Sequence, residues 1–263
     1  MLLSAIIPSY KDPLLQKTID SLLENSELGD ELEIIAVMDG YWPEPQLRGD
    51  DRVKIVHLGK NVGMREAINT GVRVSTGKYI MRSDEHCVFG EGFDRVMIGD
   101  CKDNWVMTAR RYFLDPIKWE IMGKNSVDYE KLKARDIGGG VMKFEGQVWY
   151  ERARNRKEEM IDETMAMQGS CWVMPRKWWD DVIVELDTKN YGTMYQDSHE
   201  MIFKTWKAGG KLMVNKNTWF AHKHVSFPRT HQHSRKDWEA GVKYSYKVWK
   251  DYYNDEIRKK WKI

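Results

Sequence analysis

Short apolar runs alternate with amphipathic stretches over the first hundred residues of the chain. Continuous apolar runs predict strands at 2–8, 32–38 and 53–58, and a periodic pattern predicts a helix over 12–25. Runs of Ile and Val without polar interruption are typical of strands buried on both faces, and helices between such strands indicate βαβ units. The pattern therefore predicts a doubly wound α/β domain with a parallel sheet.

Polar residues follow three of the predicted strands, at 9–10, 39–40 and 84–86. In open α/β sheets ligands bind beyond the carboxyl ends of the strands, so we expect the three segments to line one crevice. Asp84 and His86 stand two positions apart at a strand end, and side chains at i and i+2 of an extended chain share a face. A carboxylate and an imidazole placed in this way can hold a divalent cation; the alternative is a solvated turn.

Two further segments carry clear local patterns. Residues 61–71 predict a glycine-containing turn that opens a helix, with Ala67 and Gly71 four positions apart for close packing on the sheet. Residues 168–174 predict another strand. The turn is the simpler reading of the first segment, and a phosphate cradle is the alternative.

The pattern weakens between these segments, over 104–167. Within this region 136–141 has the glycines of a flexible loop, and 151–163 reads as a densely charged helix or surface segment. Long irregular stretches in compact enzymes often cover a site, so we expect this region to contact whatever the protein modifies.

The tail, 226–263, is rich in Lys, Arg, Trp and Tyr. Trp238, Val242, Tyr246 and Trp249 fall at helical spacing, which predicts a C-terminal helix docked on the main domain. Basic residues interleaved with aromatics are also found where proteins bind nucleic acid or a lipid surface, and this alternative stays open.

Composition narrows the classes of protein only a little. Lys and Arg (42) nearly balance Asp and Glu (40) over 263 residues, so no overall field selects nucleic acid as the partner. Cys87, Cys101 and Cys171 are an odd number without C-x-x-C spacing, which argues against a disulfide framework and favours a reducing, cytoplasmic compartment. No apolar run approaches 18 residues, so no membrane span is expected.

Taken together, these segments resemble the nucleotide-sugar-dependent glycosyltransferases of family 2. The resemblance is carried by the order and spacing of 5–10, 33–40, 61–71 and 77–86, and it resumes over 168–222. It implies the GT-A fold, which has a Rossmann-like, mostly parallel central sheet flanked by helices.

The same resemblance implies a division of the chain. A GT-A catalytic domain would occupy 1–225, with a nucleotide-sugar-binding half at 1–103 and an acceptor-binding half at 104–225. The basic aromatic tail at 226–263 would then be a helical extension.

By position in the family pattern, the donor-binding residues would be Pro8, Ser9, Tyr10, Asp39, Asn61, Gly63 and Asp84. The family usually has a second acid before Gly40, and here Met38 occupies that place. The resemblance therefore implies a nucleotide-diphosphate sugar, with a UDP-sugar expected and GDP and TDP left open.

The segment 84–87 reads Asp-Glu-His-Cys and resembles the Asp-x-His motif of the polypeptide N-acetylgalactosaminyltransferases. A later histidine completes the metal shell in that family. The resemblance thus implies Asp84, His86 and His222 as metal ligands, with His224 as a substitute for His222. This set of ligands suits Mn²⁺, or Mg²⁺ as the alternative.

The segment 191–200 resembles the acceptor-side acidic motif of the family, whose aspartate is the general base in inverting members. Asp197 is therefore the expected catalytic residue, and the Gln196-Asp197 pair favours inversion, although the retaining relatives align a glutamate with Asp197. The structural alternative is that Asp197 caps a helix, with Glu200 completing a capping-box-like pair.

The function implied is a metal-dependent transfer of a sugar to a hydroxyl group of a glycan, a protein or a modified nucleic acid. Three alternatives remain: the same fold acting on hydroxylated DNA bases, a nucleotide-sugar-binding protein without catalysis, and a nucleic-acid-binding protein. The sequence contains no motif that identifies the acceptor, the sugar or the oligomeric state.

Overall fold

The computed structural model describes residues 1–193, 195–224 and 235–263. The first hundred residues alternate strands and helices, as expected. In chain order they form β1 (Leu3–Ser9), α1 (Leu15–Asn25), the short helix η1 (Gly29–Glu31), β2 (Leu32–Asp39), β3 (Val53–Leu58), α2 (Met64–Val74), β4 (Tyr79–Ser83), β5 (Cys87–Phe89) and α3 (Phe93–Asp100). Every residue of β1 and β2 is buried, which explains their mainly apolar sequence.

The rest of the chain is as regular as the first part. It forms β6 (Trp105–Asp115), β7 (Glu120–Val127), β8 (Glu130–Asp136), β9 (Met142–Val148), α4 (Tyr150–Asn155), β10 (Ile161–Glu163), β11 (Cys171–Pro175), α5 (Arg176–Trp178), the π-helical turn η2 (Trp179–Ile183), α6 (Asp197–Lys207), β12 (Lys211–His222), α7 (Arg235–Tyr252), the π-helical turn η3 (Tyr253–Ile257) and α8 (Arg258–Trp261).

The expectation of a mainly irregular region at 104–167 is wrong. Five strands and α4 lie there, and the glycine-rich segment 136–141 is the connection within the β8–β9 hairpin. The strand signal is weak over much of this region because β7 and β8 expose many of their residues, and β8 and β9 each place only one side chain, Leu132 or Phe144, fully in the core.

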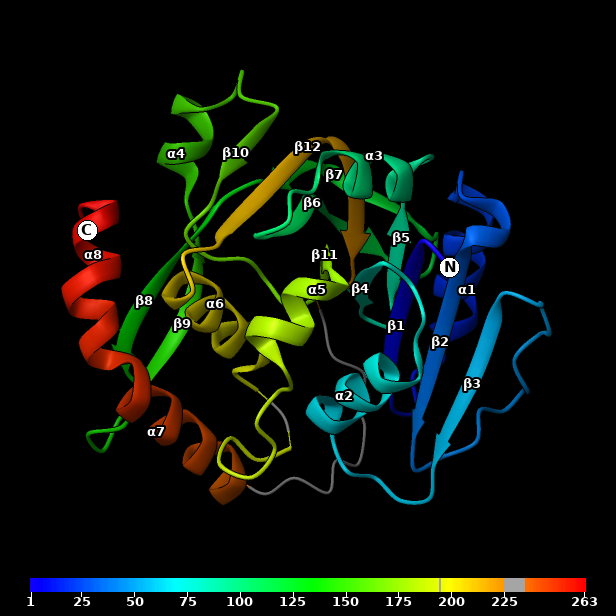
Figure 1. Ribbon diagram of the computed structural model, residues 1–263, viewed down its shortest axis with the longest axis horizontal. Helices are drawn as coiled ribbons and strands as arrows, with labels where there is room; N and C mark the ends of the chain where they lie inside the picture. The colour runs from blue at the N-terminus through cyan, green and yellow to red at the C-terminus, as the bar shows by residue number, and fades with distance from the viewer. Residues whose placement is uncertain (194, 225–234) are drawn as a thin grey trace.

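The central sheet has ten strands in the order β10-β12-β6-β11-β4-β1-β2-β3, with β5 paired to β12 and β7 to β6 (Figure 1). The strands β4, β1, β2 and β3 are parallel neighbours, as the first part of the sequence predicts. Beyond them β11 runs antiparallel between β4 and β6, and β12 pairs with β6 in parallel. The carboxyl ends of β1, β2 and β4 therefore meet at one edge of the sheet.

Helices cover both faces of the sheet (Figure 1). Neighbouring residues of β1 illustrate this, since Ile7 packs in the cluster of α1 and α3 while Ile6 packs in the cluster of α2, α6 and the C-terminal helices. A Cβ atom at Gly71 of α2 would lie 2.4 Å from Cγ2 of Ile6. The close approach of α2 to β1 confirms the packing expected from Ala67 and Gly71.

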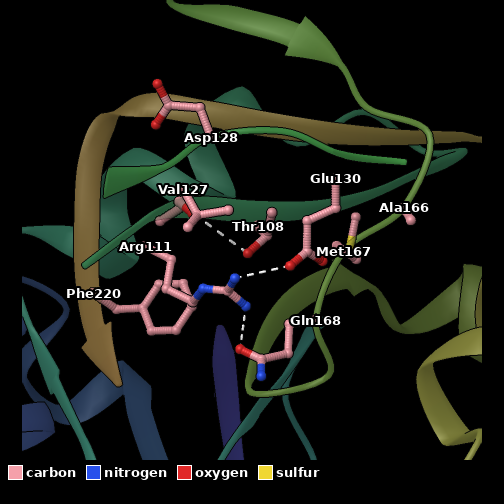
Figure 2. Close-up of a pocket in the computed structure, with 10 residues that line it drawn as sticks. Thr108, Arg111, Val127, Asp128, Glu130, Ala166, Met167, Gln168 and Phe220 are labelled. Carbon is pink, nitrogen blue, oxygen red and sulfur yellow. Dashed lines mark hydrogen bonds and ion pairs between the residues drawn. The ribbon is translucent and has the colours of Figure 1, made fainter. Parts of the chain in front are cut away.

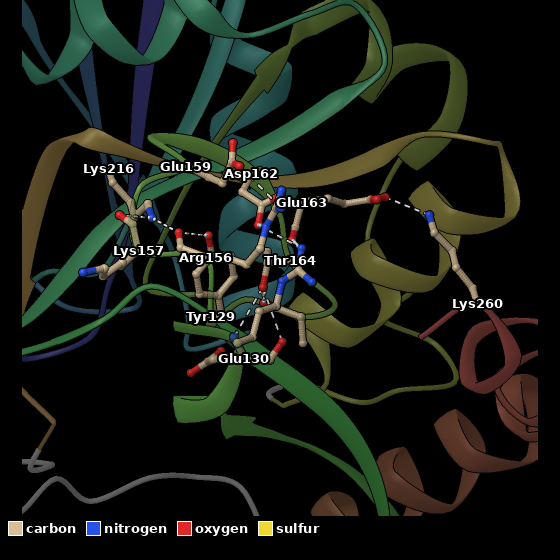
Figure 3. A network of polar contacts seen from close by, with 12 residues as sticks. Tyr129, Glu130, Arg156, Lys157, Glu159, Asp162, Glu163, Thr164, Lys216 and Lys260 are labelled. Carbon is tan, nitrogen blue, oxygen red and sulfur yellow. Dashed lines mark hydrogen bonds and ion pairs between the residues drawn. The ribbon is translucent and has the colours of Figure 1, made fainter. Parts of the chain in front are cut away.

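The charged segment 151–163 is anchored by ion pairs (Figure 3). Asp162 accepts hydrogen bonds from Arg152 at 2.9 Å and from Arg156 at 3.0 Å, and Lys260 of α8 pairs with Glu163 at 2.8 Å. These contacts hold α4 and α8 against β10, the edge strand of the sheet.

The C-terminal helices lie along the β8–β9 hairpin and α6 (Figure 1). Trp249 stacks on Phe203 with ring centroids 5.1 Å apart, and the hydroxyl of Tyr253 donates to the carbonyl oxygen of Leu132 at 3.0 Å. Docking of the tail is thus confirmed for 235–263, while 226–234 of the predicted extension lie outside the described residues. The division of the chain at 225 stays a prediction.

The described part of the chain contains no helix with the length and apolar character needed to cross a membrane.

Replacing Trp249 with Ala should lower the free energy of unfolding by about 3–5 kcal/mol, because it empties a buried aromatic contact. Val248, the preceding residue, is 44% exposed, and Val248→Ala is the matched control, expected to change stability by less than about 1 kcal/mol. Urea unfolding midpoints measure both. Equal midpoints for the two variants would contradict the docking of the tail.

Candidate active site

Three predicted metal ligands meet where β4 and β12 end. His222 is the last residue of β12, and the antiparallel pairing of β12 with β5 places it beside the segment that carries Asp84 and His86. Ligand atoms of the three side chains lie within 4.8 Å of one another, and Nε2 of His222 is 3.1 Å from Oδ2 of Asp84. His224 packs edge-on against the His222 ring and lies outside this group.

The protonation states of Asp84 and His222 suit metal binding; at His86 burial is outweighed by Asp12 and Asp84, which raise the pKa of the imidazole. Burial alone would raise the pKa of Asp84, but Arg82, and after it His222 and His86, lower that pKa far below its usual range. Burial lowers the pKa of His222, so its imidazole is neutral at pH 7. An ionised carboxylate and a neutral imidazole are the forms that ligate divalent cations.

Asp12 orients the second histidine. Its Oδ2 atom lies 2.8 Å from Nδ1 of His86, and its Oδ1 atom accepts a hydrogen bond from the backbone N–H of Leu14 at 2.8 Å. The backbone N–H of Tyr10 donates to Glu85 at 2.9 Å, so the loop after β1 is tied twice to the loop after β4. With Nδ1 occupied, Nε2 of His86 remains for a cation. Asp12, Glu85 and His86 form a second group of ligand atoms, which shares His86 with the first.

Asp39 lies buried at the end of β2 and shapes the turn before α2. Its carboxylate accepts hydrogen bonds from Nδ2 of Asn61 at 2.6 Å and from the backbone N–H groups of Val62 at 2.7 Å and Gly63 at 2.9 Å. Gly63 has φ +98°, and a Cβ atom there would lie 2.4 Å from Cβ of Thr193, so this turn requires glycine. A contact of Asp39, Asn61 or Gly63 with a nucleoside stays a prediction.

The other predicted donor residues lie near Asp39. Pro8 and Ser9 end the buried strand β1, and the hydroxyl groups of Ser9 and Tyr41 are hydrogen bonded. Tyr10 meets the Tyr41 ring edge-on, with centroids 6.0 Å apart. The topology therefore gathers these residues at the edge where ligands of such sheets bind, and their binding role stays a prediction.

Asp197 and Asp84 line one cavity of about 540 Å³. Asp197 is the first residue of α6 and is 8% exposed, and its carboxylate accepts no hydrogen bond from the described residues. The capping alternative is wrong, because no side chain caps this helix and Glu200 pairs instead with Arg65 and Lys204. Asp197 is thus a nearly buried carboxylate that faces a cavity shared with the metal-binding group.

Arg82 lies between the two carboxylates. Its Nη2 donates to Oδ1 of Asp84 at 2.6 Å, and a Cβ atom at Gly169 would lie 3.0 Å from both Nη1 of Arg82 and Oδ2 of Asp197. A side chain at position 169 would therefore press on both Arg82 and Asp197.

The sequence analysis did not single out Arg82 or Asp12. Arg82 had a signal, because it is the one charged residue in the buried strand Tyr79–Ser83. Asp12 had no such signal, because an acidic residue before a proline is common wherever a helix begins.

A buried arginine supports the turn before Asp197. Arg65 is fully buried, pairs with Glu200, and donates from Nη1 to the carbonyl oxygen of Tyr195 at 2.9 Å. Its guanidinium lies 4.4 Å from the centre of the Tyr191 ring. These contacts connect α2 to the turn that presents Asp197.

A second arginine holds the opposite wall. Figure 2 shows the guanidinium of Arg111 between Glu130 and Gln168; it is 2.8 Å from Glu130 and hydrogen bonded to Gln168. The small cavity beside it measures about 20 Å³, and Gln168 lines both this space and the larger cavity. Arg111 thereby fixes the segment 168–170 that borders Asp84 and Asp197.

The fold is that of solved GT-A glycosyltransferases. GalNAc-T7, solved with UDP, GalNAc and Mn²⁺, superposes with a TM-score of 0.72 at 16% identity, over 98% of this chain and 50% of that one. TarS 1-349 of S. aureus, solved with UDP-GlcNAc, gives a TM-score of 0.57 at 12% identity, over 90% of this chain and 63% of that one.

Sequence comparison assigns the family. Residues 4–182 match Glycosyl transferase family 2, and the chain belongs to this family of glycosyltransferases. Mouse polypeptide N-acetylgalactosaminyltransferase 4 is 22% identical over 276 residues, which cover 97% of this chain and 44% of the relative. The uncharacterized glycosyltransferase EpsJ of Bacillus subtilis (strain 168) is 37% identical over 86 residues, covering 30% of this chain and 24% of EpsJ. The chain thus spans less than half the length of these curated relatives.

Replacing Asp12 with Asn should weaken Mn²⁺ binding by about 10–100-fold, because His86 loses the carboxylate that orients its ring. Asp30→Asn, an exposed position, removes the same charge far from His86 and serves as the control. Calorimetric titration with MnCl₂ in the absence of nucleotide measures both. An affinity of Asp12→Asn within about twofold of the parent would refute the orienting role.

Proposed function

We propose that the protein transfers a sugar from a UDP-sugar to an acceptor hydroxyl group, with Mn²⁺ at the donor diphosphate and with inversion at the anomeric carbon. One observation carries the proposal: Asp84 of the metal-binding group and Asp197 line the same cavity of about 540 Å³. A transferase of this kind needs a cation for the leaving group and a base for the acceptor within reach of one sugar.

The ion would be held by Asp84, His86 and His222. A mixed set of one carboxylate and two imidazoles favours Mn²⁺ over Mg²⁺, which is the alternative. When bound, the cation supplies positive charge to the diphosphate as the glycosidic bond breaks. GalNAc-T7, the solved structure with the higher TM-score above, contains both UDP and Mn²⁺, and this supports the choice.

The donor would bind at the edge formed by β1, β2 and β4. Pro8, Ser9, Tyr10, Asp39, Asn61, Gly63 and Asp84 are the residues proposed to contact it. UDP is favoured because the two solved structures described above were obtained with UDP or UDP-GlcNAc. On this reading 1–103 is the donor half and 104–225 the acceptor half.

Asp197 would accept the proton of the attacking hydroxyl. Its carboxylate is nearly buried, and the described residues donate no hydrogen bond to it, so its lone pairs remain for an acceptor. Direct attack from this side, opposite the departing diphosphate, is a single displacement and inverts the configuration. Arg82 beside it contributes positive charge between base and metal ligand.

Two features bear on the nucleic-acid-binding alternative and on the proposed location of the protein. The aromatic side chains of α7 and η3 pack against the hairpin and α6, which leaves fewer of them for nucleic acid. The three cysteines are free and buried, in keeping with the proposed cytoplasmic location.

Binding of UDP-GlcNAc or UDP-GalNAc should require Mn²⁺ and should be lost in excess EDTA and in Asp84→Ala, because the diphosphate then has no cation. Asp103→Ala, an exposed acid, is the control and should bind like the parent. Isothermal calorimetry with each nucleotide sugar measures the affinities. Binding of the nucleotide sugar with unchanged affinity in excess EDTA would contradict the assignment of a metal site.

Asp197→Asn should bind the donor with unchanged affinity and lose about 10²–10⁴-fold in turnover, because the amide accepts no proton. Turnover is measured as UDP release, in which water replaces the acceptor, and donor affinity by calorimetry. Asp180→Asn, on the exposed side of η2, is the control. UDP release by Asp197→Asn at the rate of the parent would contradict the role of Asp197 as the general base.

A further inference from the structure

Several residues that line the cavity beside Asp197 have no role in the proposed transfer reaction. We propose that Tyr195, Gln196, Lys143 and Glu145 form an acceptor subsite for a neutral sugar ring, so that the hydroxyl deprotonated by Asp197 belongs to a saccharide. The inference rests on the proposed function, since it names the acceptor of that same reaction.

An exposed aromatic ring stands next to the proposed base. Tyr195 lines the cavity two positions before Asp197 and is 48% exposed. Trp238 of α7 backs it edge-on, with centroids 6.2 Å apart and an interplanar angle of 79°. A large ring held against a second ring but open to a cavity offers a flat apolar surface to a ligand.

The backbone that places this ring is strained. Tyr195 has φ +67° and Gln196 has φ +55°, a left-handed conformation that is uncommon for residues other than glycine. Arg65 holds the carbonyl oxygen of Tyr195 at 2.9 Å, and Nε2 of Gln196 donates to the carbonyl oxygen of Phe144 at 3.1 Å. Strain of this kind persists where the surroundings over-determine it, and it concentrates at ligand sites.

A buried acceptor atom in the same wall lacks a partner. Gln196 is 4% exposed and lines the cavity, and its Oε1 atom forms no hydrogen bond with any residue in the described ranges. A buried amide oxygen is costly to leave unpaired, and a ligand that donates hydrogen bonds would satisfy it if the side chain turned toward the cavity. Sugar hydroxyl groups are such donors.

Strand β9, to which Gln196 is hydrogen bonded, supplies charged groups of both signs. Lys143 and Glu145 of β9 also line the cavity; Lys143 can donate to hydroxyl oxygens, and Glu145, which pairs with Arg135 at 3.4 Å, can accept from hydroxyl groups. The ammonium of Lys143 is 6.0 Å from the centre of the Trp238 ring, which places it close to the aromatic wall. An aromatic face flanked by such groups matches the apolar face and polar rim of a pyranose.

The charge of the cavity disfavours a nucleic acid. Its described lining has more acidic than basic side chains, namely Asp84, Glu130, Glu145 and Asp197 against Arg82 and Lys143. Because Glu130 and Glu145 are paired with Arg111 and Arg135, the lining has no excess of positive charge to hold a strand with a phosphate on each nucleotide, and a neutral saccharide needs none.

The test is saturation-transfer NMR on the full chain, without donor, using the methyl glycosides of glucose, galactose, N-acetylglucosamine and N-acetylgalactosamine. We expect at least one glycoside to bind the parent chain. Its affinity should be about tenfold lower for Tyr195→Ala and unchanged for Tyr195→Phe, because phenylalanine keeps the ring. Tyr150→Ala removes a ring that is 67% exposed elsewhere and should bind like the parent.

Because this measurement needs no turnover, it is independent of the proposed activity. Donor calorimetry on the same samples tests that activity separately. Glycoside binding without donor binding would contradict the proposed transferase activity and would still support the saccharide site. Binding of no glycoside, or equal binding to Tyr195→Ala, overturns the inference. Stimulation of UDP release only by a Ser/Thr peptide, or only by an oligonucleotide with hydroxymethylated bases, also overturns it.

Discussion

The ionised carboxylate of Asp84 is the charge around which the site is organised. A carboxylate largely removed from water needs opposite charge and polar partners close by, and here the guanidinium of Arg82 contacts one oxygen while the neutral imidazole of His222 lies against the other. Arg82 leaves strand β4 and His222 ends strand β12, so surrounding this one group with its partners requires both halves of the sheet to be assembled. The position of β12 beside β6 and β5 is therefore a condition for the site as well as for the core.

A second constraint couples the loops that follow the parallel strands. Asp12 and Glu85 connect the loop after β1 to the loop after β4, and Asp39 holds the turn before α2. From α2, Arg65 reaches the turn before Asp197. Ligand-facing groups thus rest on hydrogen bonds between loops that are far apart in the sequence, and such bonds restrict their relative positions.

The side proposed to hold the acceptor is built differently from the side proposed to hold the donor. It is bordered by the β8–β9 hairpin, against which α7 and η3 pack through Phe144, Tyr246 and Tyr253. Strands with one solvated face tolerate many sequences, so this half can change its lining without loss of the core.

The sequence by itself determined the parts that depend on local pattern. Buried strands read as continuous apolar runs, parallel strands place their polar ends at one edge, and spacing within a family pattern singled out Asp84, His86, His222 and Asp197. Only the tertiary structure decided that Asp12 meets His86, that Arg82 stands between Asp84 and Asp197, and that 104–167 forms strands. These outcomes depend on contacts between residues far apart along the chain, and a local hydrophobic period carries no information about such contacts.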